Sequence, residues 1–308
     1  MKPAPLVANG IPKSGTYFLD AIVNATGLWQ STGLHLAAPH TVVRSSDGST
    51  STDSRPATSV IPALADGTYA NAHMIWSSEI EAAILSRNAK HVLIIRDPRD
   101  TIVSMMRWQT YNPKFVTNAA EQEAQSVLRL GFADDRARAL HFIHRMRWND
   151  YAQYAPWLKS SACHVVRFEE LYSELTDDKS ELTSVKGLLN YLSVGGIDSA
   201  SLRATLHQGV TSSGIKNKIG AWRELFGEEH MSLLDYPALN ESMAALGYTA
   251  HSHPALTKVE FYDDANGKKM RREYWNPQHP ECPSRYRVHV DQSVYVRAEP
   301  AEAAVSNP

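Results

Sequence analysis

The sequence predicts an α/β fold, with a central parallel sheet flanked by helices and a β-hairpin-rich C-terminal extension. Short apolar runs typical of buried strands alternate with helical periodicity up to about residue 250. The first of these runs leads through a glycine-containing loop into a helix, which is how a β-α-β unit begins. Beyond residue 250 the pattern becomes strand-like. These observations predict a parallel sheet covered on both faces, followed by a separate C-terminal part.

Four short segments are apolar enough to form buried strands. They are residues 6–8, 69–74, 91–95 and 164–168. Helical spacing of apolar residues predicts helices between and after them, at 18–27, 79–87, 101–108, 119–155 and 181–192. Ser78 and Glu81 have the spacing of a capping box, which marks the start of the second helix.

Residues 44–59 are rich in Ser, Thr, Asp, Gly and Pro and have no periodicity, so we expect a mobile surface loop there. In the extension, Asn266-Gly267 supplies the positive-φ positions of a tight turn between strands at 258–262 and 270–275. Residues 286–290 alternate like a further strand. The expected divisions are an α/β domain at 1–250, the extension at 251–297 and a disordered Pro/Ala/Glu-rich tail at 298–308.

The composition excludes several classes of protein. Among 308 residues, 31 Lys and Arg face 33 Asp and Glu, a net charge of −2 that gives no electrostatic footprint for nucleic acid or an anionic membrane. No apolar run approaches the roughly 18 residues that span a bilayer, and the N-terminal segment is too short and polar for a signal peptide. Cys163 and Cys282 are too few for a disulfide framework or a zinc cluster. We therefore expect a cytoplasmic protein without nucleic-acid or membrane partners.

The loop from Pro12 to Thr16 has the composition of a phosphate-binding loop. It joins a strand to a helix, whose N-terminus presents unpaired N–H groups and the positive end of its dipole. Gly15 lets the backbone approach an anion, and Lys13 adds a mobile positive charge. Ser14 and Thr16 add hydroxyl donors. The loop is not a Walker loop, because its Lys precedes the Gly; the alternative interpretation is a surface turn rich in Ser and Gly.

A second anion site is predicted at the end of the clearest strand, 91–95. Arg96 follows this strand directly, at the edge where ligands bind in open α/β sheets. Ser104 comes eight residues later, about two turns into the next helix, on roughly the face that a ligand at the strand end would meet. A planar guanidinium and a hydroxyl suit a second, separate phosphate. The alternative is a charged turn at 96–100.

The two segments together resemble the sulfotransferases that use 3′-phosphoadenosine 5′-phosphosulfate (PAPS). Residues 11–16, Ile-Pro-Lys-Ser-Gly-Thr, resemble the loop of that family that binds the 5′-phosphosulfate. Residues 95–104, with Arg and Ser eight apart, resemble its 3′-phosphate motif. The resemblance extends over about residues 5–250 and is dense around these segments. It implies the P-loop-like sulfotransferase fold.

The resemblance also implies which residues bind the nucleotide. They are Pro12, Lys13, Ser14, Gly15, Thr16, Tyr17, Phe18, Arg96, Ser104, Phe168, Lys216, Lys218, Gly220 and Trp222. Phe18 occupies the position of an aromatic ring that stacks on adenine, and Phe168 replaces a Tyr that borders it. The third cofactor motif departs from the family pattern at 215–223, where the leading Arg is Ile215 and the first Gly is Asn217. Either Lys216 or Lys218 is expected to replace the missing Arg.

Two residues are expected to carry the chemistry that the resemblance implies. Lys13 would neutralise the charge that builds on the bridging oxygen as the 5′-phosphate leaves. His73 lies 23 residues before Arg96, much where the family places its catalytic His, and would take the proton of the acceptor. The flanking Lys and Pro of the family stretch are missing here, and a structural hydrogen-bonding role is the alternative for His73. His35 and His40 are reserve candidates.

The implied reaction moves a sulfuryl group from PAPS to a small-molecule acceptor and releases 3′-phosphoadenosine 5′-phosphate (PAP). A hydroxyl acceptor is the first expectation and an amine the second, and no metal is required. His141 and His144 have i, i+3 spacing, but no third residue has a compelling metal-ligand spacing. The aromatic residues Trp29, Trp76, Trp108, Tyr111 and Trp148 line either the acceptor pocket or the core. The C-terminal extension is left open as a wall of that pocket or a homodimer contact.

Two other classes of protein remain as alternatives. A nucleotide-dependent kinase would use the same loop for ATP, but it would need a magnesium ligand and no 3′-phosphate site, so Arg96 and Ser104 argue against it. A non-catalytic module that binds PAP or PAPS would explain the altered third motif. Lys13 and His73 speak against such a module.

Overall fold

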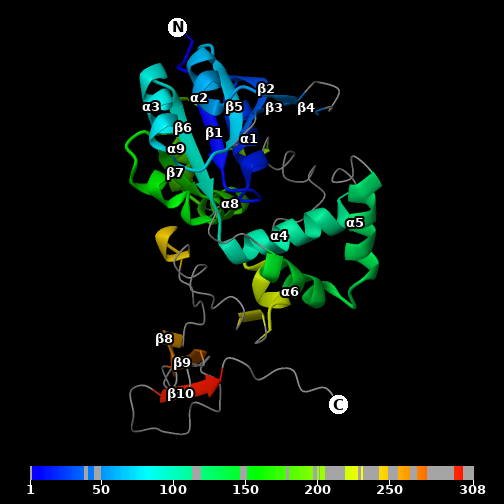
Figure 1. The fold of residues 1–308 in the computed structure, drawn as a ribbon. Coiled ribbons are helices and arrows are strands. Elements are labelled where there is room, and N and C mark those ends of the chain that lie inside the picture. The colour runs from blue at the N-terminus through cyan, green and yellow to red at the C-terminus, as the bar shows by residue number, and fades with distance from the viewer. Residues whose placement is uncertain are drawn as a thin grey trace. The chain divides into compact units, whose positions relative to one another are not determined.

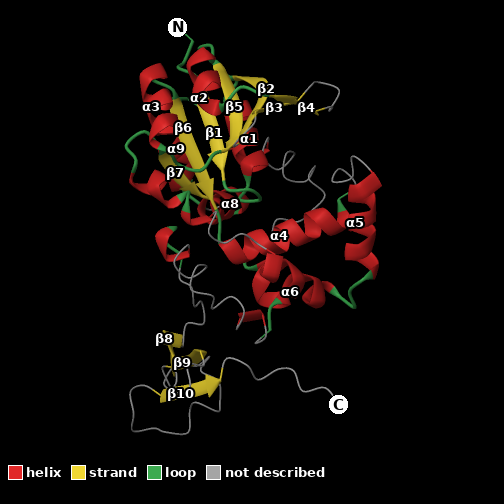
Figure 2. Cartoon of the chain, in the orientation of Figure 1, coloured by secondary structure: helices red, strands yellow, loops and turns green. Residues whose placement is uncertain are grey.

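The computed structural model divides the chain into two compact units, Met1–Tyr248 and Thr249–Pro308, each described separately below (Figures 1 and 2). The structure describes residues 2–37, 41–44, 50–112, 119–145, 151–177, 180–196, 200, 202–204, 219–227, 230–231, 243–248, 256–263, 269–275 and 295–300.

The first unit is built on a seven-stranded sheet of order β4-β3-β2-β5-β1-β6-β7 (Figure 2). Its strands are β1 Leu6–Gly10, β2 Gln30–Ala37, β3 Thr41–Arg44, β4 Thr50–Asp53, β5 Thr68–His73, β6 Lys90–Ile95 and β7 His164–Arg167. Strands β2, β5, β1, β6 and β7 are parallel, β3 pairs antiparallel with β2, and β4 pairs antiparallel with β3. The predicted parallel α/β architecture is therefore confirmed.

The central strands form because both of their faces are buried. Val7 and Leu93 point into one hydrophobic core and their neighbours Ala8 and Ile94 into the other, as the two-residue period of a strand requires. The helices covering the two faces lie on either side of the sheet in Figure 1. The helices of this unit whose bounds the structure gives are α1 Thr16–Ala25, α2 Ala57–Val60, α3 Ser78–Arg87, α4 Pro98–Tyr111, α5 Ala119–Leu130, α6 Asp135–Arg145, α8 Phe168–Thr176, α9 Thr183–Tyr191 and α11 Ala221–Leu225, with 3₁₀ helices at Ile61–Ala63 and Ala155–Lys159.

The helices divide into two groups by the face of the sheet that they cover. Helices α1, α8 and α9 contribute buried apolar residues to one core, whereas α3 and α4 contribute to the other. Helix α4 leads away from the end of β6, and α5 and α6 pack against it (Figure 1). The start of α4 therefore lies at the carboxyl end of a central strand, where the second anion site is predicted.

Several sequence-based predictions for this unit were wrong in detail. The expected mobile loop at 44–59 contains strand β4 and helix α2, and residues 30–37, where no strand was expected, form β2. Strand β4 is polar, so it escapes a search for apolar runs, but its Thr residues favour the extended backbone and pair with β3. The single helix expected over 119–155 is divided, because α5 ends before Gly131 and the Asp134 carboxylate accepts a hydrogen bond from Ala137 N (2.9 Å) at the start of α6.

The capping prediction for α3 was displaced by one residue. Ser77, not Ser78, is the N-cap, and its hydroxyl oxygen accepts a hydrogen bond from Ile80 N (3.3 Å). The Glu81 side chain instead accepts a hydrogen bond from the indole of Trp76 (3.0 Å).

The second unit contains an antiparallel three-stranded sheet of order β10-β9-β8. Strands β8, Leu256–Asp263, and β9, Lys269–Trp275, include the two strands expected for the hairpin. Strand β10, Tyr295–Pro300, overlaps the start of the segment expected to be disordered, which is therefore wrong for 298–300. The turn at 266–267, the expected strand at 286–290 and residues 301–308 lie outside the described residues. No helix in the described part of the chain is long and apolar enough to cross a membrane.

Candidate active site

The loop after β1 is shaped by its own hydrogen bonds. The Ser14 hydroxyl is fully buried and lies 2.6 Å from Ile11 O and 2.8 Å from Ile94 O. Ser14 therefore ties the loop to β6 instead of presenting its hydroxyl to a ligand. Gly15 adopts φ +105°, and a Cβ there would lie 2.5 Å from Cδ2 of Phe168, so this position requires glycine.

Lys13 is held in an unusual conformation at the tip of the loop. Its backbone has φ 68°, in the left-handed region that non-glycine residues rarely adopt. Its ammonium lies 4.8 Å from the centroid of the Trp108 ring on α4. Burial, reinforced by the positive charge of Arg96, lowers the pKa of Lys13 from 10.5 to about 8. An anion bound beside Lys13 would therefore stabilise its ammonium form, which burial and Arg96 now disfavour.

The surroundings of Thr16 indicate whether the loop could bind a phosphate. Its Oγ1 is buried and has no hydrogen-bond partner among the described residues. It lies close over Gly10, where an added Cβ would come within 2.9 Å of Oγ1. A buried hydroxyl normally has a hydrogen-bond partner, and α1 begins at this residue, so the positive end of its dipole lies beside the hydroxyl. A phosphate oxygen of a bound nucleotide would accept a hydrogen bond from the hydroxyl and lie at the positive end of the helix.

The predicted second anion site has a buried cation. Arg96 is only 3% exposed, and its guanidinium carbon lies 4.4 Å from the centroid of the Phe168 ring. Burial lowers the pKa of Arg96, while nearby carboxylates, first that of Asp100, act in the opposite direction. Ser104 is half-buried on α4, one turn before Trp108 and on the same side of the helix. Lys13 and Ser104 thus both lie beside the Trp108 turn of α4.

Three aromatic rings form a cluster, and one of them, Phe168, contacts both predicted anion sites. Phe168 packs edge-on against Phe18, with centroids 5.8 Å apart, and stacks on Tyr172 at 5.3 Å. Phe18 is 5% exposed and Phe168 is fully buried. Phe168 therefore packs against Gly15 and Arg96. Because the ring is fully buried, neither of its faces is exposed to adenine. Tyr172, which the sequence did not single out, completes the cluster.

His73 is the last residue of β5 and is anchored to the start of the loop. Its Nδ1 lies 2.6 Å from Gly10 O. Because a carbonyl oxygen only accepts, Nδ1 carries the hydrogen, and the neutral ring then has its lone pair on Nε2. The ring of His35, from β2, packs against it with centroids 4.5 Å apart. The expected catalytic histidine and one of the two reserve candidates are thus neighbours, while His40 lies outside the described residues.

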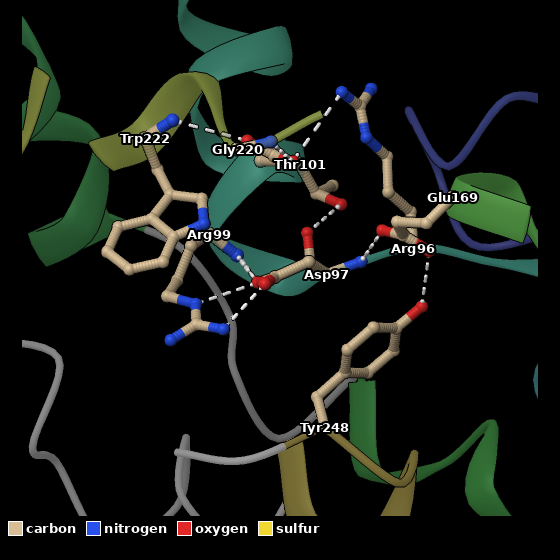
Figure 3. A network of polar contacts seen from close by, with 9 residues as sticks. Arg96, Asp97, Arg99, Thr101, Glu169, Gly220, Trp222 and Tyr248 are labelled. Atoms are coloured by element: carbon tan, nitrogen blue, oxygen red, sulfur yellow. Dashed lines mark hydrogen bonds and ion pairs between the residues drawn. The ribbon is translucent and has the colours of Figure 1, made fainter. Parts of the chain in front are cut away.

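A buried polar network surrounds the start of α4 (Figure 3). The Asp97 carboxylate is the N-cap and accepts hydrogen bonds from Arg99 N, Nε and Nη2 at 2.9, 2.8 and 2.6 Å. Glu169 accepts from Asp97 N (2.8 Å) and from the hydroxyl of Tyr248 (3.0 Å). The network therefore joins the end of β6 to α8 and to the last residue of the first unit.

Asp100 connects this network to the third cofactor motif. Its carboxylate accepts hydrogen bonds from Gly220 N (2.8 Å) and Trp222 N (3.2 Å). The Trp222 ring is buried and lies 4.2 Å from the Arg99 guanidinium carbon. Gly220 and Trp222 are thus held against the start of α4, in the region of Arg96.

The sequence of the chain matches a known domain over most of the elements just described. Residues 4–188 fit the profile of the sulfotransferase domain. The chain belongs to the sulfotransferase family. Among curated protein sequences, none matches this sulfotransferase.

Solved structures with a similar arrangement are distant in sequence. The crystal structure of the mouse sulfotransferase SULT7A1 complexed with PAP has a TM-score of 0.50 and 14% identity, covering 78% of this chain and 85% of that one. The crystal structure of retinol dehydratase in a complex with retinol and PAP has a TM-score of 0.47 and 12% identity, covering 82% of this chain and 84% of that one. The likeness to SULT7A1 shows that this sulfotransferase shares its fold.

The structure places most of the expected site residues of the sulfotransferase around the carboxyl ends of β1, β5 and β6. Pro12 is half-buried in the loop, and Tyr17 is 64% exposed in the first turn of α1. Lys216 and Lys218 lie outside the described residues. Among the described residues no group of three or more His, Cys, Asp and Glu is arranged to hold a metal ion, and His141 packs against Phe132 with ring centroids 5.1 Å apart.

Sequence reasoning missed the residues that hold this site together. Trp108 was considered only as a pocket or core aromatic, yet it lies under the Lys13 ammonium. Asp100 was considered only as part of a charged turn, and Glu169 was not singled out. The one available signal was their position beside Arg96 and Phe168; their partners are far along the chain.

Proposed function

We propose that this sulfotransferase moves a sulfuryl group from PAPS to a hydroxyl, or to an amine, of a small-molecule acceptor. The observation that carries the proposal is the coupling of His73 to the loop that presents Lys13. The ring of His73 donates to Gly10 O, three residues before Lys13. A base and a cation are therefore both attached to the loop that follows β1.

The proposed roles follow from the groups that each residue presents. The Lys13 ammonium contacts the oxygen that bridges sulfur and the 5′-phosphate, and it neutralises the charge left there when the S–O bond breaks. The loss of one such preorganised donor costs about 3–4 kcal/mol of barrier. The Nε2 lone pair of His73 takes the proton of the acceptor as its oxygen or nitrogen bonds to sulfur. The loss of a general base lowers the rate by about 10²–10⁴.

The two anion sites support PAPS as the donor. The Thr16 hydroxyl suits the 5′-phosphosulfate because it is buried without a partner among the described residues, and the N-terminus of α1 adds the positive end of the helix dipole. Arg96 with Ser104 suits the 3′-phosphate, because a buried guanidinium binds phosphate oxygens through two N–H groups at once. SULT7A1, which shares the fold, was crystallised with PAP, and this supports the same nucleotide here.

The test is transfer of ³⁵S-labelled sulfuryl from PAPS to panels of phenols, aliphatic alcohols and amines. The matched variant is His73→Asn, because the amide nitrogen of Asn can still donate to Gly10 O while the base is lost. We expect transfer by the wild-type protein and a kcat lower by about 10²–10⁴ in His73→Asn, with the KM for PAPS little changed. Phosphoryl transfer from ATP to the same acceptors, or tight PAP binding without transfer to any of them, would overturn the proposal.

A further inference from the structure

The Asp100 carboxylate belongs to helix α4 and binds the start of helix α11. It lies in the first turn of α4, is 1% exposed, and accepts from Gly220 N at 2.8 Å and Trp222 N at 3.2 Å. Gly220 is the N-cap of α11, so these are N–H groups that the short helix cannot pair by itself. The carboxylate thus replaces a local cap with one supplied from 120 residues away in the sequence.

The same carboxylate also faces the predicted 3′-phosphate ligand. The oxygen that accepts from Gly220 N, Oδ2, lies 4.0 Å from Nη2 of Arg96. The Phe168 ring contacts the guanidinium of Arg96 at 4.4 Å. The orientation of Arg96 is therefore set by an aromatic ring and by a carboxylate whose own position depends on α11.

A second contact holds α11 to the same place. The Arg99 guanidinium lies 4.2 Å over the Trp222 ring and is fixed on its other side by the Asp97 carboxylate (Figure 3). The start of α4 therefore binds α11 by a polar contact through Asp100 and by a stacked contact through Arg99. Burial raises the pKa of Asp100, while Arg96 and the Gly220 N–H favour its charged form. Burying this carboxylate costs free energy, and its contacts with Arg96 and α11 offset that cost.

We propose that Asp100 is a positioning residue for recognition of the 3′-phosphate. It holds Gly220 and Trp222 against the start of α4 and orients Arg96, so that the 3′-phosphate meets both segments at once. The inference rests on the proposed use of PAPS and adds a residue that the family motifs do not assign to the nucleotide in this chain. Asp100 itself does not contact the phosphate, because both of its carboxylate oxygens accept hydrogen bonds from α11.

The experiment compares the affinity of PAP with that of 5′-AMP, which lacks the 3′-phosphate, by isothermal titration calorimetry. We expect Asp100→Asn to lower the ratio of the dissociation constant of 5′-AMP to that of PAP by about tenfold or more. The affinity for 5′-AMP should change little, so the effect is a loss of affinity for PAP. A purely electrostatic role predicts the opposite, because loss of a negative charge should strengthen PAP binding. A merely structural role predicts equal weakening of both nucleotides. Either of these outcomes overturns the proposal.

The control variant is Tyr248→Phe. It removes a hydrogen bond from the same network, that to Glu169, and leaves the contacts of Asp100 with Arg96 and α11 in place, so its ratio should equal that of the wild-type protein. Hydrogen exchange in the wild-type protein provides a measurement that does not depend on folding of Asp100→Asn. PAP should slow exchange at Gly220 and Trp222 N–H more than 5′-AMP does, and equal protection by both would contradict the proposal. If wild-type protein shows no preference for PAP over 5′-AMP, the proposed function fails before Asp100 is tested.

Discussion

Raising the pH from 7 to 9 should weaken the binding of PAP, because it removes the charge of Lys13. Burial, and then Arg96, lower the pKa of this lysine from 10.5 to about 8 in the free protein. About nine-tenths of the Lys13 side chains are then charged at pH 7 and about one-tenth at pH 9, whereas a lysine of ordinary pKa stays charged at both. The phosphates of PAP favour the ammonium form, so affinity is present below pH 8 and is lost as the pH rises through that value.

The size of the effect follows from the same pKa. If only the charged form binds, the dissociation constant rises about tenfold between pH 7 and pH 9, or about 1.4 kcal/mol. The protein should also take up about one proton per PAP bound at pH 9 and about a tenth of a proton at pH 7. At pH 9 the phosphates do not contribute, since their second pKa of about 6 leaves them fully ionised, so the proton uptake at that pH reports on the protein.

Isothermal titration calorimetry at several pH values, in buffers of different ionisation enthalpy, measures both the affinity and the proton uptake. Lys13→Arg is the matched control, because a guanidinium stays charged throughout this range and should abolish the pH dependence. An affinity that is flat between pH 7 and pH 9 in the wild-type protein would refute the reasoning. The same dependence of PAP affinity on pH in Lys13→Arg would also refute the reasoning, because a group other than Lys13 would then be titrating.

Three further variants probe the framework of the site, each by urea denaturation. Gly15→Ala should lower the free energy of unfolding by about 1–3 kcal/mol, because its Cβ would meet Phe168 in a left-handed backbone conformation; no change would show that the loop tolerates L-residues. Asn9→Ala should cost about 3 kcal/mol, since it removes the bonds from Asn9 Nδ2 to Met74 O (3.0 Å) and from Met74 N to Asn9 Oδ1 (2.8 Å), and a loss below 1 kcal/mol would contradict this. Tyr248→Phe should cost about 1 kcal/mol, and a greater stability would mean that its hydroxyl is poorly satisfied.

The parts of the fold that could be predicted are those whose burial leaves a local pattern. Strands β1 and β6 lie between two cores, so each contains a short apolar run, residues 6–8 and 92–95, that is recognised from sequence. The loop at 12–16 was found because glycine, lysine and hydroxyl residues follow a strand and precede a helix. Its departure from expectation is equally local: the Ser14 hydroxyl bonds to backbone carbonyls, which residue type alone does not reveal.

The parts that could not be predicted depend on contacts between distant segments or on polar strands. Strand β4 is held by pairing with β3, and it has no apolar face from which a strand could be predicted. Asp100 meets Gly220 across 120 residues, and Glu169 meets Tyr248 across 79. A single sequence carries no record of such pairings. The proximity of His35 to His73 is of the same kind, since it results from parallel pairing of β2 with β5.

The most direct test of the central claim is thermal unfolding with PAP and with ADP, each in the presence and absence of magnesium. A ligand present at about 100 times its dissociation constant should add about 2.7 kcal/mol to the stability of the folded protein. We expect stabilisation by PAP that does not require magnesium, and a smaller effect of ADP because it lacks the 3′-phosphate. Stabilisation by ADP only when magnesium is present, or no stabilisation by either nucleotide, would contradict the account.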